Sequence, residues 1–326
     1  MARSDQMKAL LRAYAGNNAE QFLSVAMQVA ADEARKGHVK LAAEIRDLID
    51  EAKSRARTPQ LPRPIPLAQP RGELSELLSV TYPQAHLQEM VLSTAVTRKL
   101  QRVLKEQRES ERLKTHSLSP RRKLLLVGPP GTGKTMTAGV LAGELRLPLF
   151  TARLDNLITK FMGESSSKLR LVFDAIRITR GVYFFDEFDS LGLQRGAQID
   201  VAEMRRVLNT FLQAMDQDGS DSLIVAATNL GKDLDVALFR RFDDVIRYET
   251  PDDTQIDLLL RNRLSIFAAK SFDYRSLVST ARGRSHADIV RACLDAAKDA
   301  VLERHDFVTE DSVRQHLQER TVNPGL

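Results

Sequence analysis

A glycine-rich loop that follows an apolar strand is the feature that most constrains the fold of this chain. The apolar run 124–127 leads into Gly128-Pro129-Pro130-Gly131-Thr132-Gly133-Lys134-Thr135, and a helical pattern extends from Lys134 to Leu145. The spacing GxxxxGK[ST] lets backbone N–H groups face a phosphate, while the lysine reaches the β/γ oxygens and the threonine hydroxyl faces Mg²⁺. The positive end of the helix adds to this attraction. We therefore predict a nucleotide phosphate site here, the alternative being a purely structural turn between strand and helix.

Two acidic residues end a second apolar strand. Asp186 and Glu187 follow the run Val182–Phe185, and ligands of open α/β sheets bind at the carboxyl ends of strands. Asp186 is predicted to complete the Mg²⁺ shell, and Glu187 to polarise the water that attacks the γ-phosphate. Acids in this position are often merely solvated. Together with the glycine-rich loop, however, they favour hydrolysis of a nucleoside triphosphate.

Composition narrows the class of protein. Of the 326 residues, 43% are apolar, which is enough for a sizeable core spread over two or three domains. No apolar run approaches the length of a membrane-spanning helix, and the N-terminal stretch lacks the pattern of a secretory signal. The single cysteine, Cys293, cannot form an internal disulfide. We therefore expect a cytoplasmic protein without a membrane span.

Prolines and periodicity divide the chain. Pro62, Pro64, Pro66 and Pro70 crowd one short segment, which predicts a stiff, extended linker. Helical periodicity precedes this linker, strands and helices alternate after it, and the C-terminal part is helical. The predicted divisions are a helical N-terminal recruitment domain (1–56), a Pro-rich linker (57–73), a nucleotide-binding α/β domain (74–250) and an α-helical C-terminal domain (251–326).

Short β-like runs alternate with helical patterns in the α/β part. Such alternation predicts a parallel sheet with helices on both faces. A long charged helix is predicted over 84–113, ahead of the phosphate loop. The predicted strands are 123–127, 149–154, 182–185, 223–228 and 245–248.

These motifs resemble the AAA ATPases of the AAA+ superfamily. Residues from about Leu74 to Arg320 look like one module of the subgroup that includes katanin, spastin, the vacuolar-sorting ATPase and the zinc-protease unfoldases, and in particular like a small bacterial member. The resemblance rests on GPPGTGKT, FFDEFDSL, the sensor 1 stretch 223–229 and the second region of homology at 234–243. It implies a P-loop NTPase fold with a C-terminal α-helical lid, hydrolysis of ATP to ADP and phosphate, and ATP and Mg²⁺ as cofactors.

The same resemblance assigns roles to residues. Asn229 is expected between the γ-phosphate and the attacking water, although a turn residue would also suit its position. Arg240 and Arg241 are expected to reach the nucleotide of a neighbouring subunit, and alone they would suggest a salt-bridged surface pair. Lys134 and Glu187 complete the catalytic set. The residues implied to hold nucleotide are Gly128, Pro129, Pro130, Gly131, Thr132, Gly133, Lys134, Thr135, Met136 and Asp186, with Thr135 and Asp186 also at Mg²⁺.

A pore loop and a ring follow from the resemblance. Residues 160–165 are similar to the first pore loop of AAA unfoldases, in which Phe161 and Met162 would grip an extended polypeptide. A second pore loop is expected over 194–198. The competing interpretation places Phe161 and Met162 in the core, at the end of an amphipathic helix that begins near Leu154. Arginines that act between subunits imply a homo-oligomer, most often a hexamer.

The function implied is an ATP-driven ring that remodels, unfolds or threads a protein substrate, with an adaptor or a separate protease as candidate partners. Two alternatives are a motor or loader stimulated by nucleic acid and a nucleotide-controlled scaffold. The net charge of +5 and the basic stretch 98–123 favour the first of these, but acidic residues are mixed along the chain, so nucleic acid is not the expected partner.

Two departures from the family pattern concern the base of the nucleotide. Ser285 is predicted to cap a lid helix, as in the family's Ser-Gly-Ala-Asp stretch, but this chain has His286 in place of the glycine. The family's Asp-Ile-Gly-Gly motif is missing around residues 78–83, so the contacts with adenine stay unassigned. No catalytic role is predicted for His286.

Overall fold

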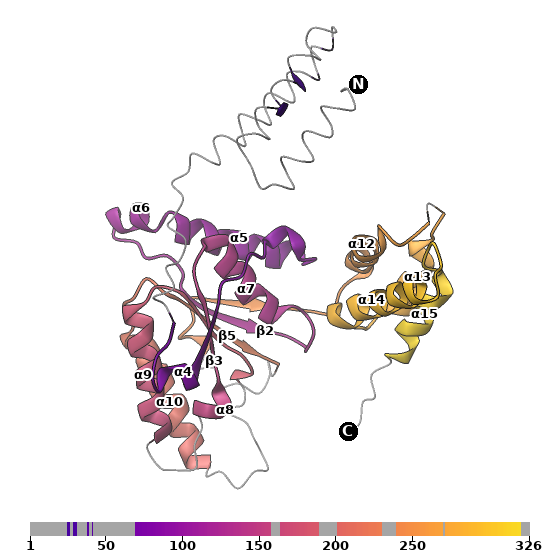
Figure 1. Ribbon diagram of the computed structural model, residues 1–326. Coiled ribbons are helices and arrows are strands. Elements are labelled where there is room, and N and C mark those ends of the chain that lie inside the picture. Colours follow the sequence, from indigo (N-terminus) through magenta and orange to yellow (C-terminus); the bar gives the residue numbers. More distant parts are fainter. Residues whose placement is uncertain are drawn as a thin grey trace. The chain divides into compact units, whose positions relative to one another are not determined.

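The structure, a computed structural model, describes residues 25–26, 29–30, 38, 41, 69–157, 164–188, 201–229, 239–269 and 271–320. The chain divides into two compact units, Met1–Arg63 and Pro64–Leu326. In the first unit, the described residues Val25, Ala26, Val29 and Ala30 are helical. Residues 57–68 of the predicted linker lie outside the described residues. The second unit contains the elements labelled α4 to α15 in Figure 1.

A six-stranded sheet forms the centre of the second unit (Figure 1). Its strands are β1 (Leu78–Thr81), β2 (Lys123–Val127), β3 (Leu149–Ala152), β4 (Val182–Phe185), β5 (Leu223–Thr228) and β6 (Asp244–Arg247). They lie in the order β1-β3-β4-β5-β2-β6, and every neighbouring pair is parallel except β1 with β3. The predicted α/β fold is therefore confirmed. Since β4, β5 and β2 are parallel neighbours, the residues that follow their carboxyl ends meet at one edge of the sheet.

Both faces of the sheet are buried, because side chains alternate along each strand. On one face Leu125 packs in an apolar cluster with Phe173 of α9 and Phe211 of α10. On the other face Leu124 packs with Leu141 of α7 and with residues of α5. Helices therefore cover both faces, as predicted. The covering helices are α5 (Thr94–Arg108), α7 (Lys134–Leu145), α9 (Glu164–Ile178) and α10 (Val201–Gln217). The shorter helices of this part are α4 (Leu74–Leu77), α6 (Ser110–Thr115) and α8 (Leu154–Leu157).

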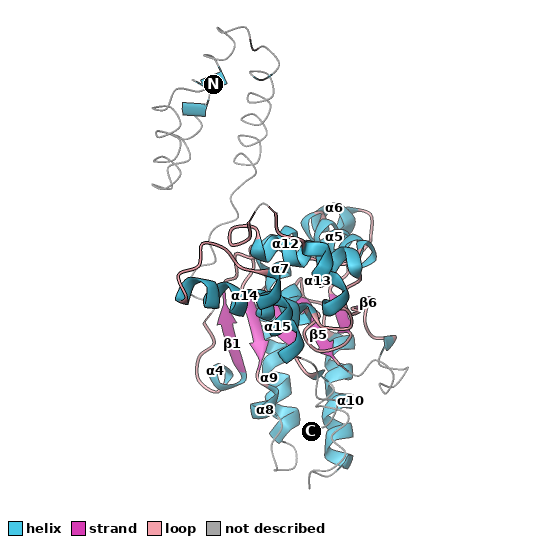
Figure 2. Ribbon diagram, turned by 90° about the vertical axis from the view of Figure 1, so that its right-hand side faces the viewer, coloured by secondary structure: helices cyan, strands magenta, loops and turns pink. Residues whose placement is uncertain are grey.

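Four C-terminal helices, which we call the lid and which are labelled α12 to α15 in Figure 2, build a separate apolar core. They are α12 (Asp253–Leu264), α13 (Tyr274–Ala281), α14 (His286–Leu302) and α15 (Glu310–Glu319). The predicted cap of α14 is confirmed, because the Ser285 side chain accepts a hydrogen bond from the Asp288 amide and the Asp288 carboxylate accepts one from the Ser285 amide. Val91, which precedes α5, also packs into the lid core. No helix of the described part of the chain has both the length and the apolar character to cross a membrane.

The prediction of one long helix over 84–113 is wrong. The Ser93 side chain caps the N-terminus of α5, so this helix begins only at Thr94. The backbone leaves the helical conformation at Glu109, which separates α5 from α6. Ahead of Ser93 lies the short 3-10 helix η2 (Leu87–Glu89). The edge strand β1 was not predicted, and the strands predicted over 149–154 and 245–248 are β3 and β6 with different ends.

Burial of the lone cysteine gives a test of the lid core. Cys293 is fully buried, and burial raises the pKa of its thiol to about 12. Since the thiolate is the reactive form, we expect a thiol reagent at pH 8 to modify Cys293 slowly in the native protein and orders of magnitude faster in denaturant. The measurement is the release of chromophore from Ellman's reagent with and without guanidinium chloride. Rapid labelling of the native protein would contradict the burial.

Candidate nucleotide-binding site

The glycine-rich loop joins β2 to α7 in a conformation that depends on its glycines. Gly131 has φ 73° and Gly133 has φ 98°, values that L side chains rarely adopt. A Cβ atom at Gly131 would also lie 2.5 Å from the hydroxyl oxygen of Ser285. The Ala287 amide donates a hydrogen bond to the Gly131 carbonyl at 3.0 Å. The beginning of lid helix α14 is therefore in direct contact with the loop.

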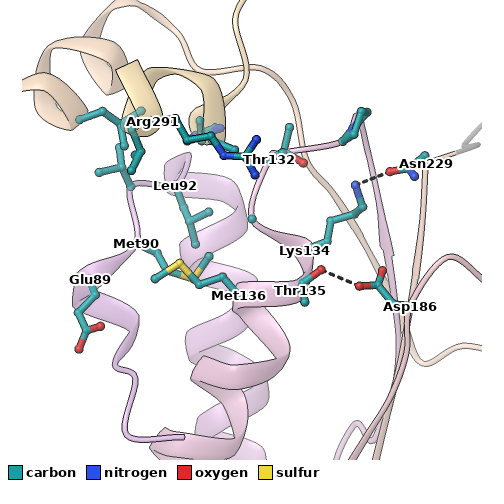
Figure 3. A pocket seen from close by; sticks show the side chains of 18 of the residues that line it. Glu89, Met90, Leu92, Thr132, Lys134, Thr135, Met136, Asp186, Asn229 and Arg291 are labelled. Carbon is teal, nitrogen blue, oxygen red and sulfur yellow. Dashed lines mark hydrogen bonds between the residues drawn. The ribbon is translucent and has the colours of Figure 1, made fainter. Parts of the chain in front are cut away.

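Lys134 is held between the loop and the end of β5. Its Nζ donates hydrogen bonds to the carbonyl oxygens of Gly128 and Pro129 at 2.7 and 2.8 Å. It also donates to Oδ1 of Asn229 at 2.9 Å, as the dashed line in Figure 3 shows. The lysine side chain is thus directed across the mouth of the loop toward the residue that follows β5. These oxygens are acceptors that a phosphate group could replace.

Thr135 and Asp186 form the part of the site that fits Mg²⁺. The Thr135 hydroxyl donates a hydrogen bond to Oδ2 of Asp186 at 2.7 Å (Figure 3). Hydroxyl and carboxylate oxygens are the ligands that this hard cation takes, and two adjacent ligands of an octahedron with Mg–O near 2.1 Å lie about 3 Å apart. The two oxygens are therefore already close to the separation that a shared Mg²⁺ requires.

Glu187 has an unusual backbone conformation beside Asp186. Its φ is 48°, in the left-handed region that few residues other than glycine adopt. The Glu187 amide donates a hydrogen bond to Oδ1 of Asp186 at 2.9 Å, and both residues line the same cavity. Strain of this kind is typical of functional positions, where the surrounding structure compensates for it. The turn places two carboxylates at the end of β4 beside the glycine-rich loop.

One cavity of about 530 Å³ joins these groups to the lid, a volume typical of small-molecule sites. In Figure 3, Asn229 and Asp186 lie on one side of it, and Met90, Leu92 and Arg291 lie on the other. Of the predicted residues, Gly128 and Pro129 do not line the cavity but contact Lys134 through their carbonyls. Those that line it are Pro130, Gly131, Thr132, Gly133, Lys134, Thr135, Met136, Asp186, Glu187 and Asn229.

The far end of this cavity was predicted only in part, because the beginning of the lid helix at Ser285 and His286 was expected near the base but the segment before α5 was not. Its lining there comes from two segments distant from the loop, one before α5 and the other in the lid. An apolar run directly ahead of the cap residue Ser93 is the signal that could have pointed to the first segment. The additional lining residues are Glu89, Met90, Val91, Leu92, Leu259, Arg263, His286, Ala287, Val290 and Arg291.

Arg240 and Arg241, which were predicted to reach the nucleotide of a neighbouring subunit, lie outside this cavity. Arg240 and Arg241 are exposed and neither lines the cavity of its own chain. Arg241 forms an ion pair with Asp216, as the surface-pair interpretation expects. Arg240 has no ion-pair partner within the described ranges. The structure therefore gives the two arginines different environments.

Most residues of the two predicted pore loops lie outside the described residues. Phe161 and Met162 lie outside the described residues, as does the segment 194–198. Glu164 and Ser165, which were assigned to the first pore loop, instead begin helix α9. That loop is therefore shorter at its C-terminal end than the sequence analysis predicted.

Comparisons with known proteins identify the family. The family model described as "ATPase family associated with various cellular activities (AAA)" matches residues 124–250. An uncharacterized AAA family ATPase, y4kL, of Sinorhizobium fredii is 35% identical over 321 residues, which cover 98% of this chain and 96% of the relative. The chain belongs to the AAA family of ATPases. Hydrolysis of ATP is accordingly its activity.

Other relatives match this AAA ATPase over a part of their length. The meiotic spindle formation protein mei-1 of Caenorhabditis elegans is 37% identical over 195 residues, which are 58% of this chain and 41% of that protein. The ATP-dependent zinc metalloprotease FtsH 4 of Sphaerobacter thermophilus is 34% identical over 211 residues, or 60% of this chain and 32% of the relative. The chain spans less than half of the length of each of these two proteins.

Proposed function

We propose that this AAA ATPase assembles into a ring, a hexamer, and uses ATP hydrolysis to remodel, unfold or thread a protein substrate. The observation that carries the ring is the position of Arg240. The glycine-rich loop, Asp186, Glu187 and Asn229 line the cavity. Arg240 is exposed and does not line it. An exposed arginine without an ion pair among the described residues is available to the pocket of a neighbouring copy.

The described groups divide the chemistry among them. The loop amides and Lys134 bind the phosphates, and Thr135 and Asp186 hold Mg²⁺, which when bound neutralises charge on the β- and γ-phosphate oxygens. Glu187 orients and polarises the attacking water. Asn229 senses the γ-phosphate through the amide whose oxygen now accepts from Lys134. In this scheme a phosphate draws Lys134 away from Asn229, which frees that amide to face the water.

The names of two relatives support a protein as the substrate. The FtsH relatives are named ATP-dependent zinc metalloproteases, so an AAA part similar to this one belongs to proteins that process polypeptides. The pair Phe161-Met162 would supply nonspecific apolar contact with an unfolded chain. A separate protease or an adaptor is therefore the partner that we propose to seek, with residues 1–56, which the sequence predicts to be helical, as the recruiting segment.

The basic stretch gives little support to a nucleic-acid motor. Lys99 pairs with Asp244 at 2.8 Å and Arg108 with Glu144 at 2.6 Å. The cations of this stretch that form ion pairs are Lys99, Arg102, Arg108, Arg112, Lys114, Arg121 and Arg122. Binding of nucleic acid relies on cations that replace counterions along phosphates. Cations already neutralised by carboxylates are poor candidates for that role.

Replacing Phe161 by alanine tests the threading step. We expect the variant to hydrolyse ATP at close to the parental rate but to lose most of its processing of an unfolded model protein, because the aromatic grip on the polypeptide is removed. The measurements are phosphate release and the rate of unfolding of a fluorescent substrate. Phe307→Ala, which removes a half-exposed phenylalanine from the lid (53% exposed), is the matched control. Undiminished processing by Phe161→Ala would favour the scaffold instead.

A further inference from the structure

The part of the cavity beyond the phosphates is lined by a segment whose position the phosphate motifs do not explain. In the proposed ATP site, the glycine-rich loop and the Thr135–Asp186 pair bind the phosphates, so the base extends toward the rest of the lining. Met90 and Leu92 lie in this remaining lining, opposite Asp186 in Figure 3. Both belong to segment 83–92, which has no regular secondary structure apart from η2. Its position therefore depends on contacts with other elements.

Two adjacent residues at the C-terminal end of α7 hold this segment. The Leu87 amide, at the beginning of η2, donates a hydrogen bond to Oε1 of Glu144 at 3.1 Å. Gly143 lies so close to the segment that a Cβ atom there would overlap the Ala85 carbonyl oxygen and lie 3.0 Å from the Ala85 nitrogen. The close approach of segment 83–92 to α7 therefore requires glycine at this position.

The Glu144 side chain is itself held in place. Arg108 of α5 donates hydrogen bonds to Oε2 of Glu144 at 2.6 Å and to its carbonyl oxygen at 3.2 Å. Burial opposes ionisation of Glu144, but the hydrogen bonds from Leu87 and Arg108 outweigh it and lower the pKa of this carboxyl. Glu144 is therefore ionised at pH 7. Its hydrogen bond to the Leu87 amide is of the charge-assisted kind, which is stronger than one between neutral groups.

The same segment contacts the beginning of α7, next to the phosphate loop. The Met90 sulfur lies 3.9 Å from the Thr137 hydroxyl oxygen. A Cβ atom at Gly133 would lie 3.1 Å from the terminal methyl carbon of Met90. Segment 83–92 thus packs at both ends of the helix that begins in the loop. Its contacts at the C-terminal end of α7 are separate from the hydrogen bonds that hold the loop and Lys134.

We propose that Gly143 and Glu144 are positioning residues for ATP binding, because they hold segment 83–92 where it receives the base of the nucleotide. The inference rests on the proposed ATP site and extends it to two residues that do not line the cavity. Since they act through the segment and not through the loop, their replacement weakens binding of the base and leaves binding of the phosphates unchanged.

The test separates these two contributions with a matched pair of glycines in α7. Isothermal titration in the presence of Mg²⁺ would measure binding of ATP and of inorganic tripolyphosphate to the parent, Gly143→Ala and Gly139→Ala. Gly143→Ala is expected to bind ATP about tenfold more weakly and tripolyphosphate as before. A Cβ atom at Gly139 would lie 3.9 Å from that of Pro83, an ordinary contact, so Gly139→Ala should bind both like the parent. Alanine is the better helix former in both variants.

Replacement of Glu144 reaches the same segment by a different route. Glu144→Ala removes the acceptor of the Leu87 amide, and we expect the same selective loss of affinity for ATP. Glu144→Gln keeps an acceptor oxygen and should regain part of that affinity. In steady-state assays KM for ATP should rise about tenfold in Glu144→Ala, whereas kcat at saturating ATP stays close to the parental value.

Three results would overturn the inference. One is unchanged affinity for ATP in both Gly143→Ala and Glu144→Ala. Another is an equal loss of affinity for ATP and tripolyphosphate in these variants, which indicates that the two residues only support α7 and its loop. The third is a parent that binds ATP no more tightly than tripolyphosphate, which removes the inference while leaving the proposed ATP-driven function intact. That function fails instead if the parent does not bind ATP.

Discussion

Replacement of Glu187 by glutamine is expected to slow ATP turnover by about 10²–10⁴-fold while ATP binding persists. The amide keeps the size of the side chain but cannot polarise water as a carboxylate does. The backbone of Glu187 has φ 48° and donates its amide to the Asp186 carboxylate, and both residues line the cavity. The measurements are steady-state phosphate release and the identity of the bound nucleotide after rapid desalting, which we expect to be ATP and not ADP.

A second glutamate of the same cavity provides the control. Glu89 also lines the cavity, but Figure 3 places it on the side away from Asp186. In Glu89→Gln the amide oxygen can still accept from the His86 amide, the bond that Glu89 makes at 3.2 Å. We expect near-parental turnover from this variant. Full turnover by Glu187→Gln would remove Glu187 from the reaction.

Local sequence determines the phosphate end of the site, which is why it could be predicted. The loop and α7 are contiguous, and the helix predicted from Lys134 to Leu145 has those bounds in the structure. Asp186 and Asn229 follow apolar runs that become β4 and β5. Because parallel strands run in the same direction, their carboxyl ends lie at one edge of the sheet, and the residues that follow them lie close together.

The base end depends on tertiary contacts and was therefore predicted only in part, through the lid helix that Ser285 caps. Residues 84–93 lie in a charged, periodic stretch that predicts helix, but the Ser93 cap stops α5 and leaves Val91 free to pack into the lid core. Strand β1 has only four residues and owes its conformation to antiparallel pairing with β3, from Leu78 with Ala152 to Thr81 with Leu149. No local pattern in the sequence reports such a pairing.

The contact between the lid and the loop joins the nucleotide cavity directly to the lid helices. Gly131 contacts Ser285 and Ala287 at the beginning of α14, and the cavity is lined by both the loop and the lid. Loss of a phosphate at the loop therefore alters the surroundings of the N-terminus of α14. This helix packs against α12 and α15. For a proposed ring, this is the step by which the state of one pocket reaches the rest of the subunit.

Arg240→Ala is expected to reduce ATP turnover by about 10³–10⁵-fold, because a guanidinium that stabilises charge on the γ-phosphate is lost. Because Arg241 forms an ion pair with Asp216, Arg241→Ala should reduce ATP turnover by a smaller factor. The decisive measurement mixes two nearly inactive variants, Arg240→Ala and Glu187→Gln. If Arg240 acts on the pocket of the neighbouring subunit, a mixed ring contains interfaces where an intact Glu187 faces an intact Arg240.

Random mixing in equal amounts makes about a quarter of the interfaces complete, since each of the two groups is intact in half of the subunits. Turnover should therefore rise to roughly that fraction of the parental rate. The control mixes Glu187→Gln with Asn229→Ala, two changes in the same pocket, and no recovery is expected because every pocket carries one defect. Absence of recovery in rings shown to contain both Arg240→Ala and Glu187→Gln subunits would place Arg240 outside the neighbour's pocket, and the requirement for a ring would lose its support.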